Sequence, residues 1–177
     1  MDKQQIEAAK SAYIERLALT GEEDGMPRIA GRLIGYLTMN QGAYSLDEIA
    51  DALQASKASV STNARLLEER GILIRTSSPG DRRDFYEISP APWEMFINNA
   101  TRKVQKSMDA VEATLPKLPP EDVANRRLKE ARLFYRFLLD RLAECKVMWQ
   151  QAIREAEQNG EFDLPKATAS DTTKEPQ

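Results

Sequence analysis

Residues 45–71, SLDEIADALQASKASVSTNARLLEERG, decide the fold of this chain. The first four form a capping box, in which the Ser45 hydroxyl and the Glu48 carboxylate satisfy backbone N–H groups at a helix start. Ser56 can cap a second helix a few residues after the first one ends, and Gly71 can close that helix in the left-handed conformation. Two short helices joined so tightly predict a helix-turn-helix.

A strand pattern follows the second helix. Two stretches with the pattern of β-strands, 72–76 and 85–89, flank the turn-rich stretch 77–84, SSPGDRRD. This order is typical of a β-hairpin. A hairpin directly after a helix-turn-helix forms a wing, so we predict that residues 27–89 are a winged helix-turn-helix domain.

Two helices and a short strand are expected before the motif. The apolar positions between 6 and 20 recur every three or four residues, which predicts an amphipathic helix. The stretch 21–25 holds three consecutive acidic residues and predicts a solvated linker. Pro27 suits the first turn of the next helix, because its missing N–H would have no partner there. That helix is expected to stop near Gly42, and residues 43–44 could form one short strand.

Two long helices are expected after the wing. Pro92 opens the first, which ends before Pro116, and the second begins near Glu121. The apolar residues of the second alternate spacings of three and four over roughly three heptads, which predicts a helix–helix seam. The seam residues are Leu128, Ala131, Tyr135, Leu138, Leu142, Cys145, Trp149 and Ala152. The near absence of apolar residues beyond Gly160 predicts a disordered tail.

The pattern as a whole predicts a mainly α fold, a winged helix-turn-helix domain with a small β-hairpin wing, flanked by long dimerisation helices. The expected regions are an N-terminal helix and linker for dimerisation (1–26), the DNA-binding domain (27–89), a helical dimerisation and effector region (90–160) and the tail (161–177).

The composition limits the functions open to the chain. It has 177 residues, a net charge of -3, one Cys and no His. The usual general base and the commonest metal ligand are therefore missing, and Cys145 cannot form an intrachain disulfide. No stretch approaches the roughly 20 apolar residues that span a bilayer. We expect a cytoplasmic protein without catalytic activity, cofactor or metal, in which Cys145 is an inert core thiol rather than a redox sensor.

The second helix of the motif has two different faces. Val60, Ala64 and Leu67 share the inward face, while small and polar residues occupy the outward and flanking positions. Such a face can enter the major groove of DNA, where hydroxyl, amide and guanidinium groups bond base edges and phosphates. Before Leu67 the helix holds two cations and no acid. Its predicted DNA-binding residues are Ser56, Lys57, Ala58, Ser59, Ser61, Thr62, Asn63 and Arg65.

Three arginines belong to the predicted wing. Arg82 and Arg83 lie in its turn, and Arg75 lies on the strand that leads to it. Arginines on such a loop can enter a minor groove. Asp81 and Asp84 could hold them in register by ion pairing, which would reduce the local positive charge.

Three segments carry a resemblance to a known family: MPRIAGRLIGYL at 26–37, SKASVSTN at 56–63 and GDRRDFY at 80–86. Together they resemble the GbsR branch of the MarR-type transcriptional regulators, over roughly residues 5–155. The resemblance implies a homodimer whose two recognition helices bind a palindromic operator in double-stranded DNA, typically as a repressor. It also implies control of osmoprotectant uptake and synthesis.

A small-molecule effector follows from the same resemblance. A quaternary ammonium ligand would need a cage of aromatic rings, and the same rings could instead fill the helical core or the dimer seam. The candidate cage residues are Trp93, Phe96, Tyr135 and Trp149, with Phe134 and Phe137 also available. The expected dimer contacts are Ile6, Tyr13, Leu17, Leu138, Leu142 and Trp149. The seam could also pack within one chain, against the helix that Pro92 opens.

One alternative function remains open on the sequence alone. The acidic isoelectric point of about 5.2 suits a winged helix that serves as a protein–protein adaptor. Arg82 and Arg83 would then meet an acidic partner instead of phosphate.

Overall fold

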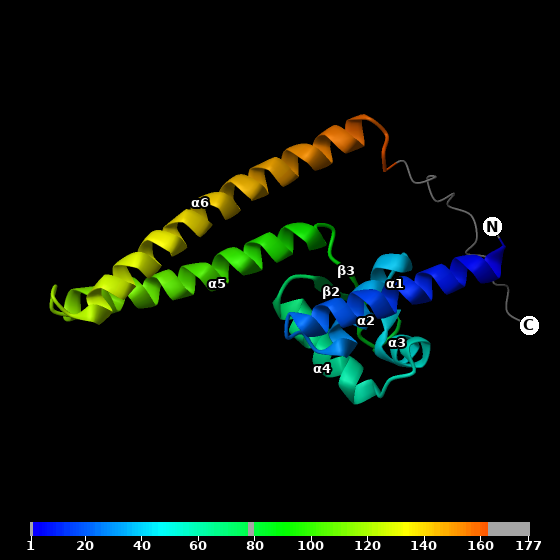
Figure 1. The fold of residues 1–177 in the computed structure, drawn as a ribbon. Coiled ribbons are helices and arrows are strands. Elements are labelled where there is room, and N and C mark those ends of the chain that lie inside the picture. Colours follow the sequence, from blue (N-terminus) through cyan, green and yellow to red (C-terminus); the bar gives the residue numbers. More distant parts are fainter. Residues whose placement is uncertain (1, 78–79, 163–177) are drawn as a thin grey trace, which may run out of the picture. The chain divides into compact units, whose positions relative to one another are not determined.

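The computed structural model describes residues 2–77 and 80–162, which fold into helices and a small sheet (Figure 1). In chain order the elements are α1 (Lys3–Glu23), α2 (Arg28–Met39), β1 (Tyr44–Ser45), α3 (Leu46–Leu53), α4 (Lys57–Glu69), β2 (Leu73–Thr76), β3 (Phe85–Ile88), α5 (Pro92–Thr114), the 3-10 helix η1 (Leu115–Lys117) and α6 (Val123–Gln158). The chain divides into two compact units between Ala100 and Thr101. This architecture confirms a mainly helical winged helix-turn-helix fold with long C-terminal helices.

The helix-turn-helix forms through local hydrogen bonds. The Ser45 hydroxyl accepts a 3.3 Å bond from the Glu48 amide, and the Glu48 carboxylate accepts a 2.8 Å bond from the Ser45 amide. Helix α3 ends at Gln54, whose φ of 48° is left-handed. Two residues later Ser56 begins α4 by accepting a 3.2 Å bond from the Ser59 amide. The predicted capping box and tight turn are both present.

The sheet has three antiparallel strands in the order β1-β3-β2. Strand β1 pairs Ser45 with Phe85, and β2 pairs Leu73 with Ile88. The short strand before α3 therefore adds to the predicted hairpin. Of the predicted wing turn, residues 78–79 lie outside the described residues.

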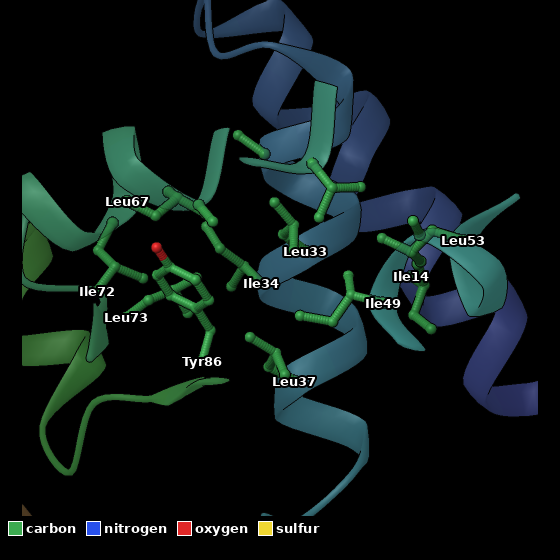
Figure 2. Packing of buried hydrophobic residues seen from close by; sticks show 14 residues of the cluster. Ile14, Leu33, Ile34, Leu37, Ile49, Leu53, Leu67, Ile72, Leu73 and Tyr86 are labelled. Atoms are coloured by element: carbon green, nitrogen blue, oxygen red, sulfur yellow. The ribbon is translucent and has the colours of Figure 1, made fainter. Parts of the chain in front are cut away.

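Helix α2 lies at the centre of one hydrophobic core (Figure 2). Ile72, Leu73 and Tyr86 pack on one side of it, and Ile14 and Leu53 lie on the other. The buried cluster comprises Ile14, Ala30, Leu33, Ile34, Leu37, Ile49, Ala50, Leu53, Val60, Ala64, Leu67, Ile72, Leu73 and Tyr86. Burial of apolar area in this cluster holds α1, the helix-turn-helix and the sheet together.

Helix α1 approaches α2 closely at two glycines. A Cβ atom at Gly31 would lie 2.6 Å from the Ala18 Cα, and one at Gly35 would lie 3.0 Å from the Ile14 Cα. Real Cβ atoms essentially never approach so closely as the first distance. The two backbones therefore meet because these two positions carry no side chain.

The predicted linker at 21–25 is wrong at its start. Helix α1 continues to Glu23, and Gly21 is buried where the Met26 side chain folds back over it. Only Asp24 and Gly25 turn the chain toward α2, with a left-handed φ of 76° at Gly25. The Met26 amide donates a 2.8 Å bond and the Asp24 amide a 3.2 Å bond to the Gly21 carbonyl, and these bonds close the helix after Glu23.

The second unit contains α6, a helix of 36 residues. It begins at Val123, where the Asp122 carboxylate accepts a 2.7 Å bond from the Ala124 amide. Asn125 is buried and donates a 3.1 Å bond from its amide group to the Leu118 carbonyl.

No helix in the described residues is both long and apolar enough to cross a membrane. Most of the predicted tail, 163–177, lies outside the described residues.

Candidate nucleic-acid interface

The outward face of α4 carries most of the predicted DNA-binding residues. Val60, Ala64 and Leu67 are fully buried, and this fixes the opposite face toward solvent. Lys57, Ala58, Thr62 and Arg65 are exposed there, together with the cap residue Ser56, while Ser59 and Ser61 are half-buried beside them. The face is mostly polar, and the major groove is wide enough to admit an α-helix whose polar side chains bond base edges.

Asn63 does not join this face. Asn63 is only 8% exposed, and its side-chain amide group donates a 2.9 Å bond to the Ser59 carbonyl. A signal in the sequence could have shown this, because Val60, Asn63, Ala64 and Leu67 have the spacing of one inward stripe. The structure gives Asn63 a place in the packing of α4.

Both cations of α4 are held by neighbours. Lys57 Nζ lies 2.7 Å from Asp47 Oδ1 on α3, so its charge is balanced at the start of the recognition helix. Arg65 donates from Nη2 to the Ser61 hydroxyl at 2.9 Å. This bond holds the guanidinium along the outward face without neutralising it.

Arg83 makes most of its contacts within the wing. Its Nη2 lies 2.6 Å from Asp81 Oδ2, its Nε lies 2.9 Å from the same oxygen, and its backbone amide donates to Asp81 Oδ1 at 2.9 Å. The guanidinium stands over the Phe85 ring at 5.3 Å from the centroid and reaches the Ser45 hydroxyl at 3.5 Å. The hydrogen bond from Arg83 lowers the pKa of the Asp81 carboxyl and, conversely, raises the pKa of Arg83.

The other two wing arginines differ from each other. Arg75 Nη2 lies 2.9 Å from Asp84 Oδ1, so the predicted pairing of Asp84 involves the strand arginine and neither arginine of the turn. Arg82 is exposed, and no residue in the described part of the chain forms an ion pair or hydrogen bond with its side chain. The free cation of the wing is therefore Arg82, as far as the described residues show.

The four candidate cage residues fall into two groups. Trp93 and Phe96 lie in the first unit, where their rings stack with centroids 6.1 Å apart and planes 18° apart. Tyr135 and Trp149 lie on α6, fourteen residues apart, a helical rise of roughly 21 Å. Tyr135 and Trp149 of one chain therefore cannot close on a single small cation.

The expected dimer contacts are only partly exposed. Ile6 is 41% exposed, whereas Tyr13 and Leu17 of α1 are half-buried, as are Leu138, Leu142 and Trp149 of α6. Cys145 is exposed, so the prediction of a core thiol is wrong for the single chain. The sequence pattern missed a second apolar set on α6 that faces solvent: Val123, Leu133, Phe134, Phe137, Val147 and Met148.

No group of three or more His, Cys, Asp or Glu residues among the described ones is placed to hold a metal ion. The chemistry that this surface offers is recognition by hydroxyl, amide and guanidinium groups. An exposed recognition helix beside an arginine-bearing wing defines a DNA-binding transcriptional regulator of the winged helix-turn-helix class.

Comparisons with known proteins agree with that class. A profile of the MarR family matches residues 24–84. The chain is 32% identical to the HTH-type transcriptional regulator MmpR5 of Mycobacterium tuberculosis over 124 residues, which cover 68% of this chain and 74% of the relative. It is 31% identical to the HTH-type transcriptional repressor GbsR of Bacillus subtilis over 89% of this chain and 90% of the relative. The chain belongs to the MarR family.

A solved structure supports the same assignment. The crystal structure of a transcriptional regulator superposes with a TM-score of 0.71 at 27% sequence identity, covering 81% of this chain and 99% of that chain. Membership of a family of transcriptional regulators confirms the prediction that the chain is not an enzyme.

Proposed function

We propose that this regulator binds a palindromic operator as a homodimer, with α4 of each chain in the major groove and the wing on the backbone or in the minor groove. The observation that carries the proposal is the outward face of α4, which is exposed and free of acidic residues from Lys57 to Leu67. Base-reading roles fall to Thr62 and Ala58, and phosphate contacts to Lys57, Arg65, Arg82 and Arg83. Ser56, Ser59, Ser61 and Arg75 complete the proposed contact surface.

Dimerisation follows from the chemistry of the helices and from the geometry of DNA. Two recognition helices must lie about 34–36 Å apart to read two half-sites on one side of the duplex. Exposed apolar residues on both flanking helices, such as Ile6 and Leu19 on α1 and Leu133 and Phe137 on α6, would be covered by a second chain. We assign regions 1–26 and 90–160 to this interface and region 27–89 to DNA.

We propose that the protein represses transcription. Support comes from the relative GbsR, which is a transcriptional repressor and aligns over 89% of this chain. A regulator that occupies an operator overlapping a promoter represses by excluding other proteins. An osmolyte-related effector stays a prediction from the resemblance.

The test is fluorescence anisotropy with the full chain and two labelled duplexes, one random and one selected from genomic fragments that the protein retains. We expect tighter binding to the selected duplex, and affinity for both that falls linearly on a plot of log affinity against log salt. Sedimentation velocity should give a dimer. Absence of DNA binding at low salt would contradict the proposal and favour the adaptor function.

A further inference from the structure

The exposed apolar residues of the long helix α6 (Figure 1) are arranged symmetrically about the middle of that helix. Since α6 spans residues 123–158, its midpoint falls between residues 140 and 141. Leu133 and Met148 lie equally far from this midpoint, on opposite sides of it, and so do Phe134 and Val147. All four residues are more than half exposed. A second α6 that runs in the opposite direction would therefore place apolar residues against apolar residues.

These symmetric residues share one side of α6. At about 100° per residue, Phe137 lies near the centre of the arc that they cover, and Phe137 is itself 56% exposed. Residues of the heptad seam, such as Tyr135, Leu138 and Leu142, lie on the other side of the helix and are half-buried. Helix α6 therefore has two apolar faces, and the face that contains Phe137 is open to solvent in the single chain.

The charged residues at the midpoint suit the same antiparallel arrangement. In it, Asp140 of each chain meets Arg141 of the other chain, with one such pair on each side of the two-fold axis. Within one chain, Arg141 Nη2 lies 2.6 Å from Glu144 Oε1, and the guanidinium carbon lies 5.8 Å from the centroid of the Phe137 ring. No ion pair in the described part of the chain includes Asp140. Arg141 of a second chain would supply the missing cation.

The outer parts of the helix agree with this centred register. Arg126 lies opposite Glu155 of the other chain, and Glu130 lies opposite an uncharged residue. Sliding one helix by four residues, about one turn, keeps the same faces in contact but changes the pairs. In one direction Glu130 meets Glu155, and in the other direction Leu133 meets Glu144. The centred register avoids both mismatches.

We propose that the α6 helices of two chains pair in antiparallel fashion through the face that contains Leu133, Phe137 and Met148, with the two-fold axis at the helix midpoint. The partner is a second copy of this chain, so the inference deepens the proposed function and rests on it for the existence of a homodimer. Packed helices lie about 8–10 Å apart, and ion pairs beside the seam set their orientation. Full overlap of two helices of 36 residues extends over roughly 54 Å.

The centred register also specifies the position of the cysteine. Cys145 of one chain and Cys145 of the other would lie nine residues apart along the paired helices, a distance of roughly 13.5 Å. The Cα atoms of a disulfide are usually about 4.4–6.8 Å apart. The two native thiols of a dimer should therefore stay unlinked under mild oxidation, although each is exposed in the single chain.

Disulfide trapping in the full chain tests the register. In a Cys145→Ser background, Phe137→Cys together with Glu144→Cys places two thiols across the proposed seam. These positions are seven residues apart on one helix, about 10.5 Å, so a disulfide between them has to join two chains. Tyr135→Cys together with Leu142→Cys has the same spacing on the heptad-seam face and is the matched control. On non-reducing gels we expect linked dimers from the first pair and unlinked chains from the control.

Three outcomes of the trapping experiment overturn the proposal. The first is a linked dimer from the control pair alone, and the second is the absence of linked dimers from both pairs while circular dichroism shows intact helices. The third is efficient linkage of wild type through Cys145.

Charge reversal at the midpoint covers the case in which the cysteine pair disturbs the seam. Asp140→Lys and Arg141→Glu each set like charges against each other across the two-fold axis, and the double variant restores two opposite pairs. Each single variant should weaken dimerisation at least about tenfold, and the double variant should return to within about threefold of wild type. Sedimentation velocity over a dilution series measures the dimer constant. Losses that simply add in the double variant refute the register.

DNA binding is measured separately by anisotropy. A protein that dimerises and binds DNA, but gives no linked dimer from the first pair, refutes the seam and leaves the proposed function standing. Linked dimers without DNA binding contradict the proposed function and leave the seam standing, so the two failures are distinguishable.

Discussion

Lys57 and Asp47 form an ion pair, Nζ to Oδ1 at 2.7 Å, that joins the first residue of the recognition helix to the first turn of α3. The side chains are 60% and 48% exposed, so the pair contributes little to stability. If Lys57 contacts DNA as proposed, Asp47 competes with a phosphate for the same ammonium group.

Asp47→Asn should therefore strengthen DNA binding several-fold, because Lys57 becomes free to contact phosphate. The slope of log affinity against log salt should steepen by about one unit. Anisotropy titrations at several salt concentrations measure both quantities. Asp51→Asn makes the same charge change on α3 without touching Lys57, and an equal gain there would show that net charge alone is responsible.

Arg82→Ala and Arg83→Ala should both weaken binding to all DNA sequences, but for different reasons. Loss of Arg82 removes an exposed cation and leaves the wing intact. Loss of Arg83 also releases Asp81 and Phe85, so the wing amides should exchange with solvent faster. Hydrogen exchange of the two variants provides the comparison. Arg83→Lys should not restore the wing, because lysine lacks the planar fork that meets the Asp81 carboxylate.

Thr62→Ala should change which operator is preferred more than it changes overall affinity. Thr62 is exposed on the outward face of α4 and has a hydroxyl and a methyl group to offer to base edges. Selection of bound sequences from a random DNA pool, by wild type and variant in parallel, measures the preference. Identical selected sequences would remove Thr62 from the base-reading set.

Gly31→Ala should destabilise the first unit by about 2 kcal/mol, since a Cβ 2.6 Å from the Ala18 Cα forces the two helices apart. Helix propensity alone would predict a gain of about 1 kcal/mol. Gly35→Ala, with its Cβ 3.0 Å from the Ile14 Cα, should cost less. Urea unfolding compares these variants, and a Gly31→Ala chain as stable as wild type would refute the close contact.

Acid should weaken the start of α3 through Glu48. Hydrogen bonds from Ser45 lower the pKa of the Glu48 carboxyl below its ordinary value of 4.5. A carboxyl whose pKa is lower in the folded state stabilises the fold above its unfolded pKa, and that contribution disappears as pH falls through the folded pKa. The free energy of unfolding should therefore drop below about pH 4.5, and Glu48→Gln should flatten this dependence. The exposed Glu69→Gln serves as the control.

Local chemistry explains which elements were predictable from sequence. The Ser45 and Glu48 cap, the Ser56 cap and the end of α4 at Gly71 all depend on hydrogen bonds within a few residues. These elements can be predicted from the sequence because their hydrogen bonds need no partner from a distant part of the chain. The same holds for the inward face of α4, where three apolar residues fix the rotation of the helix.

The predictions that were wrong or incomplete concern contacts and faces that local sequence signals do not determine. The pairing of Asp84 with Arg75 instead of an arginine of the turn depends on how β2 and β3 align. Asn63 is polar and is therefore predicted among the DNA-binding residues, although its spacing belongs to the inward stripe. The exposed apolar set that includes Leu133 and Phe137 is not predicted by the heptad pattern, because that pattern identifies one face of α6 only.

The glycine contact between α1 and α2 has a mechanical meaning. The close contact of the two backbones at Gly31 and Gly35 resists sliding of one helix along the other, so α1 and α2 should move together as one rigid pair. If two chains join through α1, the angle between the two α1 helices then fixes the orientation of each DNA-binding domain. Tolerance for operators with altered half-site spacing must then come from bending of the DNA, or from flexure elsewhere in the chain.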